Sequence, residues 1–171
     1  VAGWVWTHRP PGTQLETCIE TGDADCAAKW MSHMDKNGTL ELYENFTPLY
    51  YAASKNQTKV VQALLDAGCD PNVPTKKHEM KARSDGKERN ERQRLNTTSG
   101  EETALMAACQ LLNPEMVKAL LDKGADPNMI SARKESALSY ASYGVETFNG
   151  QPIPELFKAR RAIVTALFEH K

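Results

Sequence analysis

Near its middle the chain reads Val-Val-Gln-Ala-Leu-Leu-Asp-Ala-Gly-Cys-Asp-Pro-Asn (residues 60–72), and 56 positions later it reads Met-Val-Lys-Ala-Leu-Leu-Asp-Lys-Gly-Ala-Asp-Pro-Asn (residues 116–128). Thr-Pro-Leu at 47–49 and Thr-Ala-Leu at 103–105 precede the two copies at equal distances, and Ser-Ala-Leu at 136–138 opens a third copy. Internal repeats of this kind indicate structural units that stack, because a unit of two short helices cannot bury its apolar side alone.

Each copy predicts a helix, a tight turn, a second helix and an extended connection. Thr47 followed by Pro48 is a strong helix start, with a hydroxyl N-cap and a proline in the first helical position. The second helix carries an apolar stripe at positions 60, 61, 64 and 65, which is the spacing of a helix with one buried side. Gly68 can adopt the left-handed conformation that ends the helix, and the Asp-Pro-Asn at 70–72 then turns the chain outward.

These residues resemble the ankyrin repeat, whose pattern has a Thr-Pro-Leu opening, a Val-x-x-Leu-Leu stripe and a Gly-Ala-Asp-x-Asn close. The resemblance implies an all-α solenoid of about four helix-turn-helix units with degenerate terminal repeats. The histidine that usually follows Thr-Pro-Leu is Tyr50, Met106 or Ser139 in this chain. Other groups must therefore replace the hydrogen bonds that this histidine makes between repeats.

We expect a single ankyrin-repeat domain over residues 13–171. Its repeats cover about 13–38, 42–73, 98–130 and 131–171, and residues 74–97 form a long insertion between the second and third. Residues 74–100 hold eight Lys or Arg and four Asp or Glu, whereas the whole chain has a formal net charge of −1. The insertion is either a solvated loop without a role, with or without a short helix around 87–94, or a projecting basic arm that seizes an acidic patch on a partner.

In residues 1–12 the first six residues are apolar and Trp-rich, and the sequence then changes abruptly to the polar Thr-His-Arg-Pro-Pro-Gly. This pattern resembles the end of a signal peptide or membrane helix and predicts an export or membrane-proximal segment. The alternative is an arbitrary start, with Trp4 and Trp6 packed on the first repeat. Export would place the protein outside the cytoplasm, in a bacterial periplasm and with an N-terminal membrane anchor upstream of the sequence; a cytoplasmic location is the alternative.

The four cysteines lie at positions of different character. Cys18 and Cys26 fall on the two antiparallel helices expected for the first repeat, where a disulfide is geometrically conceivable. Both could equally be small buried residues, as free cysteines commonly are. Cys69 and Cys109 occupy small-residue positions and predict packing roles. The histidines are scattered and no CxxC or HxxxH pair occurs, so we expect no metal and no cofactor.

No catalytic motif occurs in the sequence, and a helical stack offers no deep pocket to gather distant reactive groups, so we expect no enzymatic activity. The low net charge argues against nucleic acid as a partner, and we expect no small-molecule substrate. The resemblance implies that a protein partner binds the projecting loops and the exposed side of the first helix of each repeat. The sequence then predicts these contact residues: Tyr43, Glu44, Phe46, Ser54, Lys55, Glu101, Glu102, Cys109, Gln110, Arg133, Glu135 and Tyr143, with Lys76, Lys77, Arg83, Lys87, Arg89 and Arg92 from the insertion.

Two alternatives stay open at this point. Tyr43 and Phe46 could instead pack down onto the degenerate first repeat, and Tyr50 and Tyr51 are expected in the core or between repeats. The function we expect is non-catalytic protein binding by an exported inhibitor or immunity-type protein that occludes a toxin or secreted enzyme. The alternative is a scaffold or adaptor that joins two proteins without inhibiting either.

Overall fold

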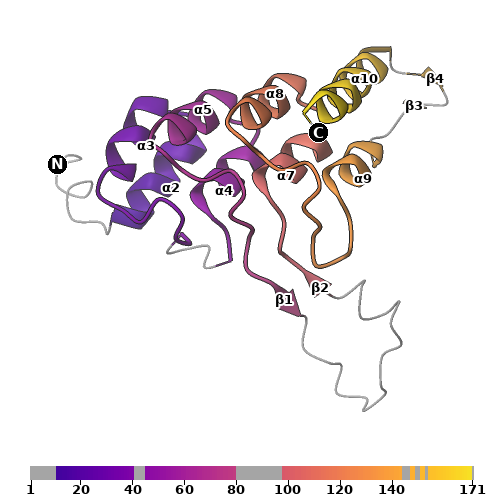
Figure 1. Cartoon of the computed structure of the whole chain (residues 1–171). Coiled ribbons are helices and arrows are strands. Elements are labelled where there is room, and N and C mark those ends of the chain that lie inside the picture. Colours follow the sequence, from indigo (N-terminus) through magenta and orange to yellow (C-terminus); the bar gives the residue numbers. More distant parts are fainter. Residues whose placement is uncertain are drawn as a thin grey trace.

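The computed structural model describes residues 11–40, 45–79, 98–143, 147–148, 151–152 and 154–170. These residues contain eight helices in four consecutive pairs: α2 (Pro11–Thr21) with α3 (Ala24–Met31), α4 (Pro48–Ser54) with α5 (Thr58–Asp66), α7 (Ala104–Gln110) with α8 (Pro114–Asp122), and α9 (Ala137–Ser142) with α10 (Pro154–Glu169). The pairs stack in sequence order, so that α2 and α3 form one end and α9 and α10 the other (Figure 1). The predicted all-α solenoid is confirmed.

The apolar stripes of the second helices form the centre of this stack. Val60, Val61 and Leu64 of α5 are fully buried, as are their equivalents Met116 and Leu120 of α8. The first helices begin at the predicted caps, where Thr47 Oγ1 accepts a hydrogen bond from the Tyr50 amide at 3.2 Å and Thr103 Oγ1 accepts one from the Met106 amide at 3.4 Å. In the two middle units, the helix starts and the apolar stripes predicted from the sequence therefore match the observed caps and buried residues.

A ladder of asparagine side chains joins the loops that follow the helix pairs. Asn37 Oδ1 accepts a hydrogen bond from the Asp70 amide at 3.0 Å, and Asn72 Oδ1 accepts one from the Asp126 amide at 2.7 Å. The first, degenerate unit thus uses Asp35-Lys36-Asn37 as the later units use Asp-Pro-Asn. The sequence analysis missed this rung, although the Asp-x-Asn spacing was present.

The chain on either side of the insertion forms a short ribbon. Thr75 donates its amide to the Glu102 carbonyl at 2.9 Å, and the Glu101 amide returns a hydrogen bond to the Thr75 carbonyl at 3.0 Å. Beyond them β1 (His78–Glu79) and β2 (Thr98–Ser99) pair antiparallel. Gly100 lies beside this ribbon at φ +100, where an added Cβ would lie 2.1 Å from the Lys76 carbonyl oxygen, so only glycine fits.

The sequence analysis predicted no strands at this point, because residues so far apart in the chain give no local signal of pairing. A second ribbon, β3 (Thr147–Phe148) with β4 (Gln151–Pro152), lies in the enlarged turn before α10. The predicted helix around 87–94 falls outside the described residues, as do Trp4 and Trp6. No helix in the described ranges has both the length and the apolar character needed to cross a bilayer.

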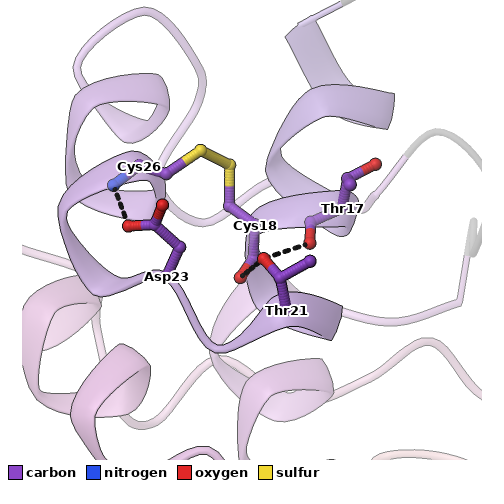
Figure 2. Close-up of a disulfide and its surroundings, with 5 residues drawn as sticks. All are labelled: Thr17, Cys18, Thr21, Asp23 and Cys26. Atoms are coloured by element: carbon purple, nitrogen blue, oxygen red, sulfur yellow. Dashed lines mark hydrogen bonds between the residues drawn. A yellow bond between two sulfur atoms is a disulfide. The ribbon is translucent and has the colours of Figure 1, made fainter.

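The first unit is stapled by a disulfide. Cys18 of α2 and Cys26 of α3 are joined, with their Cα atoms 5.7 Å apart, and Asp23 caps α3 by accepting a hydrogen bond from the Cys26 amide at 2.9 Å (Figure 2). Of the two alternatives for this pair, the structure therefore has the disulfide. Cys69 and Cys109 are free and buried, and desolvation raises their pKa values to about 11 and about 12, so both thiols stay protonated at neutral pH.

Candidate functional site

The candidate site is the surface formed by the C-terminal turns of the first helices and the extended loops between units. Thr47, Thr103 and Ser136 are equivalent caps, so residues at equal distances from them line up across the stack. Seven positions after each cap stand Ser54, Gln110 and Tyr143, and all three are exposed. We call these positions, together with the loop residues 101–102 and 133–135, the inner surface.

Glu102 is the central polar group of the inner surface. Its carboxylate accepts a hydrogen bond from the Tyr50 hydroxyl at 2.5 Å and a second from the Tyr140 hydroxyl at 2.9 Å. The three side chains come from three successive units, and Glu102 is half-buried between them. This tyrosine–glutamate clamp links neighbouring repeats, as the sequence analysis required of some group once the usual histidine was absent.

The environment of the clamp also raises the pKa values of its two tyrosines. Burial and the hydrogen bond to Glu102 both raise the pKa of Tyr50 well above its usual range. Burial likewise raises the pKa of Tyr140, and Glu102 adds to this effect. Both hydroxyls therefore stay protonated, as hydrogen-bond donors, to a higher pH than an exposed tyrosine would.

A second tyrosine–glutamate pair lies beside the clamp, at the last unit of the stack. The Tyr143 hydroxyl donates a hydrogen bond to Glu135, and this hydrogen bond raises the pKa of Tyr143. The Tyr140 and Tyr143 rings meet edge to face with their centroids 6.1 Å apart. The positive charge of Arg133 is near enough to oppose the rise in the pKa of both Tyr50 and Tyr143, so it belongs to the same cluster.

Aromatic side chains continue the inner surface toward the first unit. Phe46 packs against Tyr50 with ring centroids 5.1 Å apart and against Tyr51 at 6.4 Å. Tyr51 is buried and its hydroxyl donates to Glu20 Oε1 at 2.8 Å, which fastens the first unit to the second. The Lys55 ammonium lies 5.2 Å from the centre of the Tyr51 ring, within the range of a cation–π contact.

The structure therefore separates the predicted contact residues into groups. One prediction needs correction: Cys109 is fully buried, because its side of α7 faces the core. Phe46 is half-buried within its aromatic cluster, and Glu102 is half-buried and uses both carboxylate oxygens within the clamp. Glu135 is half-buried and paired with Tyr143. The exposed members are Ser54, Lys55, Lys76, Lys77, Glu101, Gln110, Arg133 and Tyr143. Outside the described residues lie Tyr43, Glu44, Arg83, Lys87, Arg89 and Arg92.

The sequence analysis did not identify two residues at this site, the buried Tyr140 of the clamp and the exposed Leu111. Tyr140 was not among the predicted contacts, although its helix position equals that of Tyr51, which also anchors a neighbouring unit. Leu111 follows Gln110 and is 43% exposed, which is unusual for a leucine in a folded stack. Its position equals that of Lys55, so a comparison of the repeats could have marked it as outward-facing.

The chemistry that this surface offers is recognition by contact. It presents an exposed tyrosine and an exposed arginine on a rigid framework, and these two residue types are enriched at protein interfaces. Within the described residues, no group of three or more His, Cys, Asp or Glu side chains is arranged to hold a metal ion. An open groove of about 670 Å³ lies elsewhere, between α8 and α10, and its lining includes Lys118, Arg161 and Ala166.

Two segments of the chain, residues 44–76 and 101–132, match the sequence model of the ankyrin repeat. They contain the helix pairs α4–α5 and α7–α8, and the clamp residues Tyr50 and Glu102 lie one in each segment. No curated protein matches the chain at a significant level of sequence similarity.

Proposed function

Because the chain is an ankyrin-repeat protein, and such repeats are protein–protein interaction modules that are generally non-catalytic, we propose that its inner surface binds one principal protein partner. The tyrosine–glutamate clamp carries this proposal. It holds three units in one geometry, so the exposed Tyr143 and Arg133 are already positioned before the partner arrives. Such preorganisation reduces the entropy lost on binding and favours a tight complex.

The consequence of binding that we propose is inhibition by occlusion, as an immunity-type protein would act on a toxin or secreted enzyme. A surface built from several stacked units is extended enough to cover a functional region of a partner. The rival is a scaffold that joins two proteins. The two differ in what happens to the partner's activity when the protein is added.

An extracytoplasmic location, such as a bacterial periplasm, belongs to this proposal. The disulfide between Cys18 and Cys26 supports it, because structural disulfides persist in oxidising compartments and are rare in the cytosol. The apolar, Trp-rich start of the sequence points the same way. Recovery of the disulfide in protein isolated from its native host, by mass spectrometry under alkylating conditions, tests this part; only free thiols at both positions would contradict it.

The basic insertion adds a proposed electrostatic contribution. Lys76 and Lys77 are exposed at the base of the ribbon, next to an insertion that carries further basic residues. A partner with an acidic patch would be steered by this charge, which would show as an association rate that falls with added salt.

The experiment is capture of the partner from the native host with the 171-residue chain, followed by titration against that partner. We expect Tyr143→Ala and Arg133→Ala each to weaken binding about tenfold or more, since truncation of interface hot spots costs at least ~1–2 kcal/mol. Lys59→Ala and Lys118→Ala, exposed on the second helices, are matched controls that should bind normally. If both inner-surface variants bind the partner as tightly as the wild type, the inner surface is not the binding site. If the partner keeps its full activity at stoichiometric addition, the scaffold function is favoured over inhibition.

A further inference from the structure

The first helix pair depends on its disulfide because its local helix signals are weak. Helix α2 has no acidic residue in its first turn and carries Glu20 in its last turn, the opposite of what the helix dipole favours. Helix α3 has eight residues, too few for a helix that is stable by itself in water. The bond between Cys18 and Cys26 joins the two helices (Figure 2). When this bond is absent, we expect the first unit to open before the other units.

A continuous set of side-chain contacts leads from the first unit to the clamp. Glu20 of α2 accepts a hydrogen bond from the Tyr51 hydroxyl at 2.8 Å. The Tyr51 ring lies against Phe46, with centroids 6.4 Å apart, and Phe46 lies against Tyr50 at 5.1 Å. Tyr50 then donates its hydroxyl to Glu102 at 2.5 Å. We call Glu20, Tyr51, Phe46 and Tyr50 the aromatic link, because they connect the first unit to the third through the second.

The geometry of the aromatic link depends on where α2 holds Glu20. This residue lies two positions after Cys18, in the last turn of α2. If α2 and α3 separate, the Glu20 carboxylate no longer stands in front of the Tyr51 hydroxyl. Tyr51 in turn positions Lys55, whose ammonium lies 5.2 Å from the centre of its ring. Residues 46–55, which we call the near end of the inner surface, therefore depend on a closed first unit.

The two cysteines differ in how easily an external sulfur can approach them. Cys18 is 3% exposed, whereas Cys26 is half-buried, so exchange takes place first at Cys26. The Cys26 thiolate attacks an external disulfide, which forms a mixed disulfide and releases one thiol. The Cys18 thiolate then attacks the Cys26 sulfur and releases the second thiol. Two electrons pass from the cysteines to the external disulfide, and the two cysteine protons end on the released thiols.

We propose that oxidation of Cys18 and Cys26 by an external disulfide is the step that makes the inner surface competent to bind. In the reduced chain the first unit opens, and the near end of the inner surface loses its fixed arrangement. In the oxidised chain the same side chains are preorganised, which lowers the entropy lost on binding. The protein is thus kept inactive until it reaches an oxidising compartment. This inference rests on the proposed function, because it concerns the regulation of the same surface.

Hydrogen exchange read by mass spectrometry tests the coupling without a partner. It compares the 171-residue chain oxidised with glutathione disulfide and the same chain reduced with dithiothreitol. On reduction we expect exchange in α2 and α3 to rise about 30-fold or more, the effect of losing a cross-link that closes so short a loop. Exchange at residues 46–55 should rise several-fold, while α9 and α10 should not change. Equal exchange at residues 46–55 in the two states would overturn the proposal.

Variants of the aromatic link separate it from a general loosening of the stack. In the oxidised chain, Tyr51→Phe and Glu20→Ala remove the hydrogen bond while the disulfide stays in place. Each should raise exchange at residues 46–55 several-fold and leave α3 protected. Asp25→Ala is the matched control, an exposed carboxylate of the same unit outside the link, and should leave residues 46–55 unchanged. If the link variants behave like this control, the proposal is wrong.

Titration against the captured partner distinguishes this inference from the proposed function. We expect the reduced chain and Cys18→Ala/Cys26→Ala each to bind at least about fivefold more weakly than the oxidised wild type, because the near end must then be ordered on binding. If oxidised and reduced chains bind equally, the redox control is refuted while the binding function stands. If Tyr143→Ala and Arg133→Ala leave binding intact, the inner surface is not the binding site, and its control by oxidation falls with it.

Discussion

At the scale of single residues, the glutamate that precedes a helix cap decides how the units are held together. Glu102 stands where Phe46 and Glu135 stand in the neighbouring units, yet only Glu102 receives hydroxyl groups from the units on both sides. Its partners are 52 and 38 positions away in the chain. One carboxylate thus performs the linking role that the repeat pattern usually gives to a histidine.

Replacing Glu102 with alanine should lower the free energy of unfolding by about 1–3 kcal/mol, because two partly buried tyrosine hydroxyls lose a charged acceptor. Chemical denaturation followed by circular dichroism measures this loss. Glu101→Ala is the control, since Glu101 is exposed and should change stability by no more than about 0.5 kcal/mol. Equal effects for the two variants would mean that the clamp contributes nothing.

The same tyrosines predict the response to alkaline pH. The pKa values of Tyr50 and Tyr140 are raised in the folded protein, so their stabilising effect is complete below the unfolded pKa of about 10 and is lost as the pH rises above it. The buried thiols Cys69 and Cys109 act in the same direction, from about pH 9 upward.

Urea denaturation at intervals from pH 7 to about pH 11 measures this dependence. We expect Tyr50→Phe/Tyr140→Phe to be less stable at pH 7 and to lose less stability above pH 10, since the titrating hydroxyls are gone while both thiols remain. If the free energy of unfolding of the double variant falls with pH as steeply as that of the wild type, groups other than these two tyrosines cause the alkaline loss of stability.

At the scale of elements, the first helix pair departs most from the repeat pattern and carries the covalent support. Helices α2 and α3 bury Leu15, Ile19 and Met31, but they lack the Thr-Pro-Leu opening of the middle units. A terminal unit contacts a neighbour on one side only, so it gains less from stacking than an internal one. The disulfide and the Tyr51–Glu20 hydrogen bond compensate for this.

Removing the disulfide with Cys18→Ala/Cys26→Ala should lower the free energy of unfolding by about 2–3 kcal/mol, the chain-entropy value for so short a loop. Reductant should destabilise the wild type by a similar amount and leave the double variant unchanged. In a Trp4→Phe/Trp6→Phe background, fluorescence of the half-buried Trp30 on α3 reports this unit, and circular dichroism reports the whole stack. If reductant destabilises the double variant equally, the effect does not come from this bond.

At the scale of the whole molecule, a short ribbon joins the stack to the insertion. The ribbon hydrogen bonds of Thr75, Glu101 and Glu102 close the insertion at its base, directly below the clamp. Thr75 is buried although it lies within the segment assigned to the insertion from sequence. The stack therefore extends into the first residues of that segment.

Deleting residues 80–97 and joining β1 to β2 by a short glycine-containing turn should leave the helical content and the cooperativity of unfolding unchanged, because every ribbon contact is retained. A longer deletion from residue 75 should lower stability, since the hydrogen bonds of Thr75 to the loop before α7 are lost. Circular dichroism melts of the two deletions provide the comparison. If the two deletion variants are equally stable, the ribbon contributes nothing to the stability of the stack.

The sequence by itself determined the helical units, their order and their type of stacking. The signals that define these helices are local in the sequence. They are caps such as Thr47 and Thr103, the apolar stripes of the second helices, and the Gly-x-Asp-Pro-Asn segments that end them. Such signals act between residues a few positions apart, so they specify a helix without reference to the rest of the fold. Their repetition in register predicted the solenoid, and with it the general position of the inner surface.

Only the tertiary structure decided which side chains on that surface are available. The packing of three units brings Tyr50 and Tyr140 onto Glu102, so its carboxylate also links the units. Cys109 was a predicted contact, and the packing of α7 buries it instead. The same packing paired the ribbon strands and completed the asparagine ladder. These contacts join residues tens of positions apart, and their geometry depends on how closely neighbouring units approach, which no local pattern specifies.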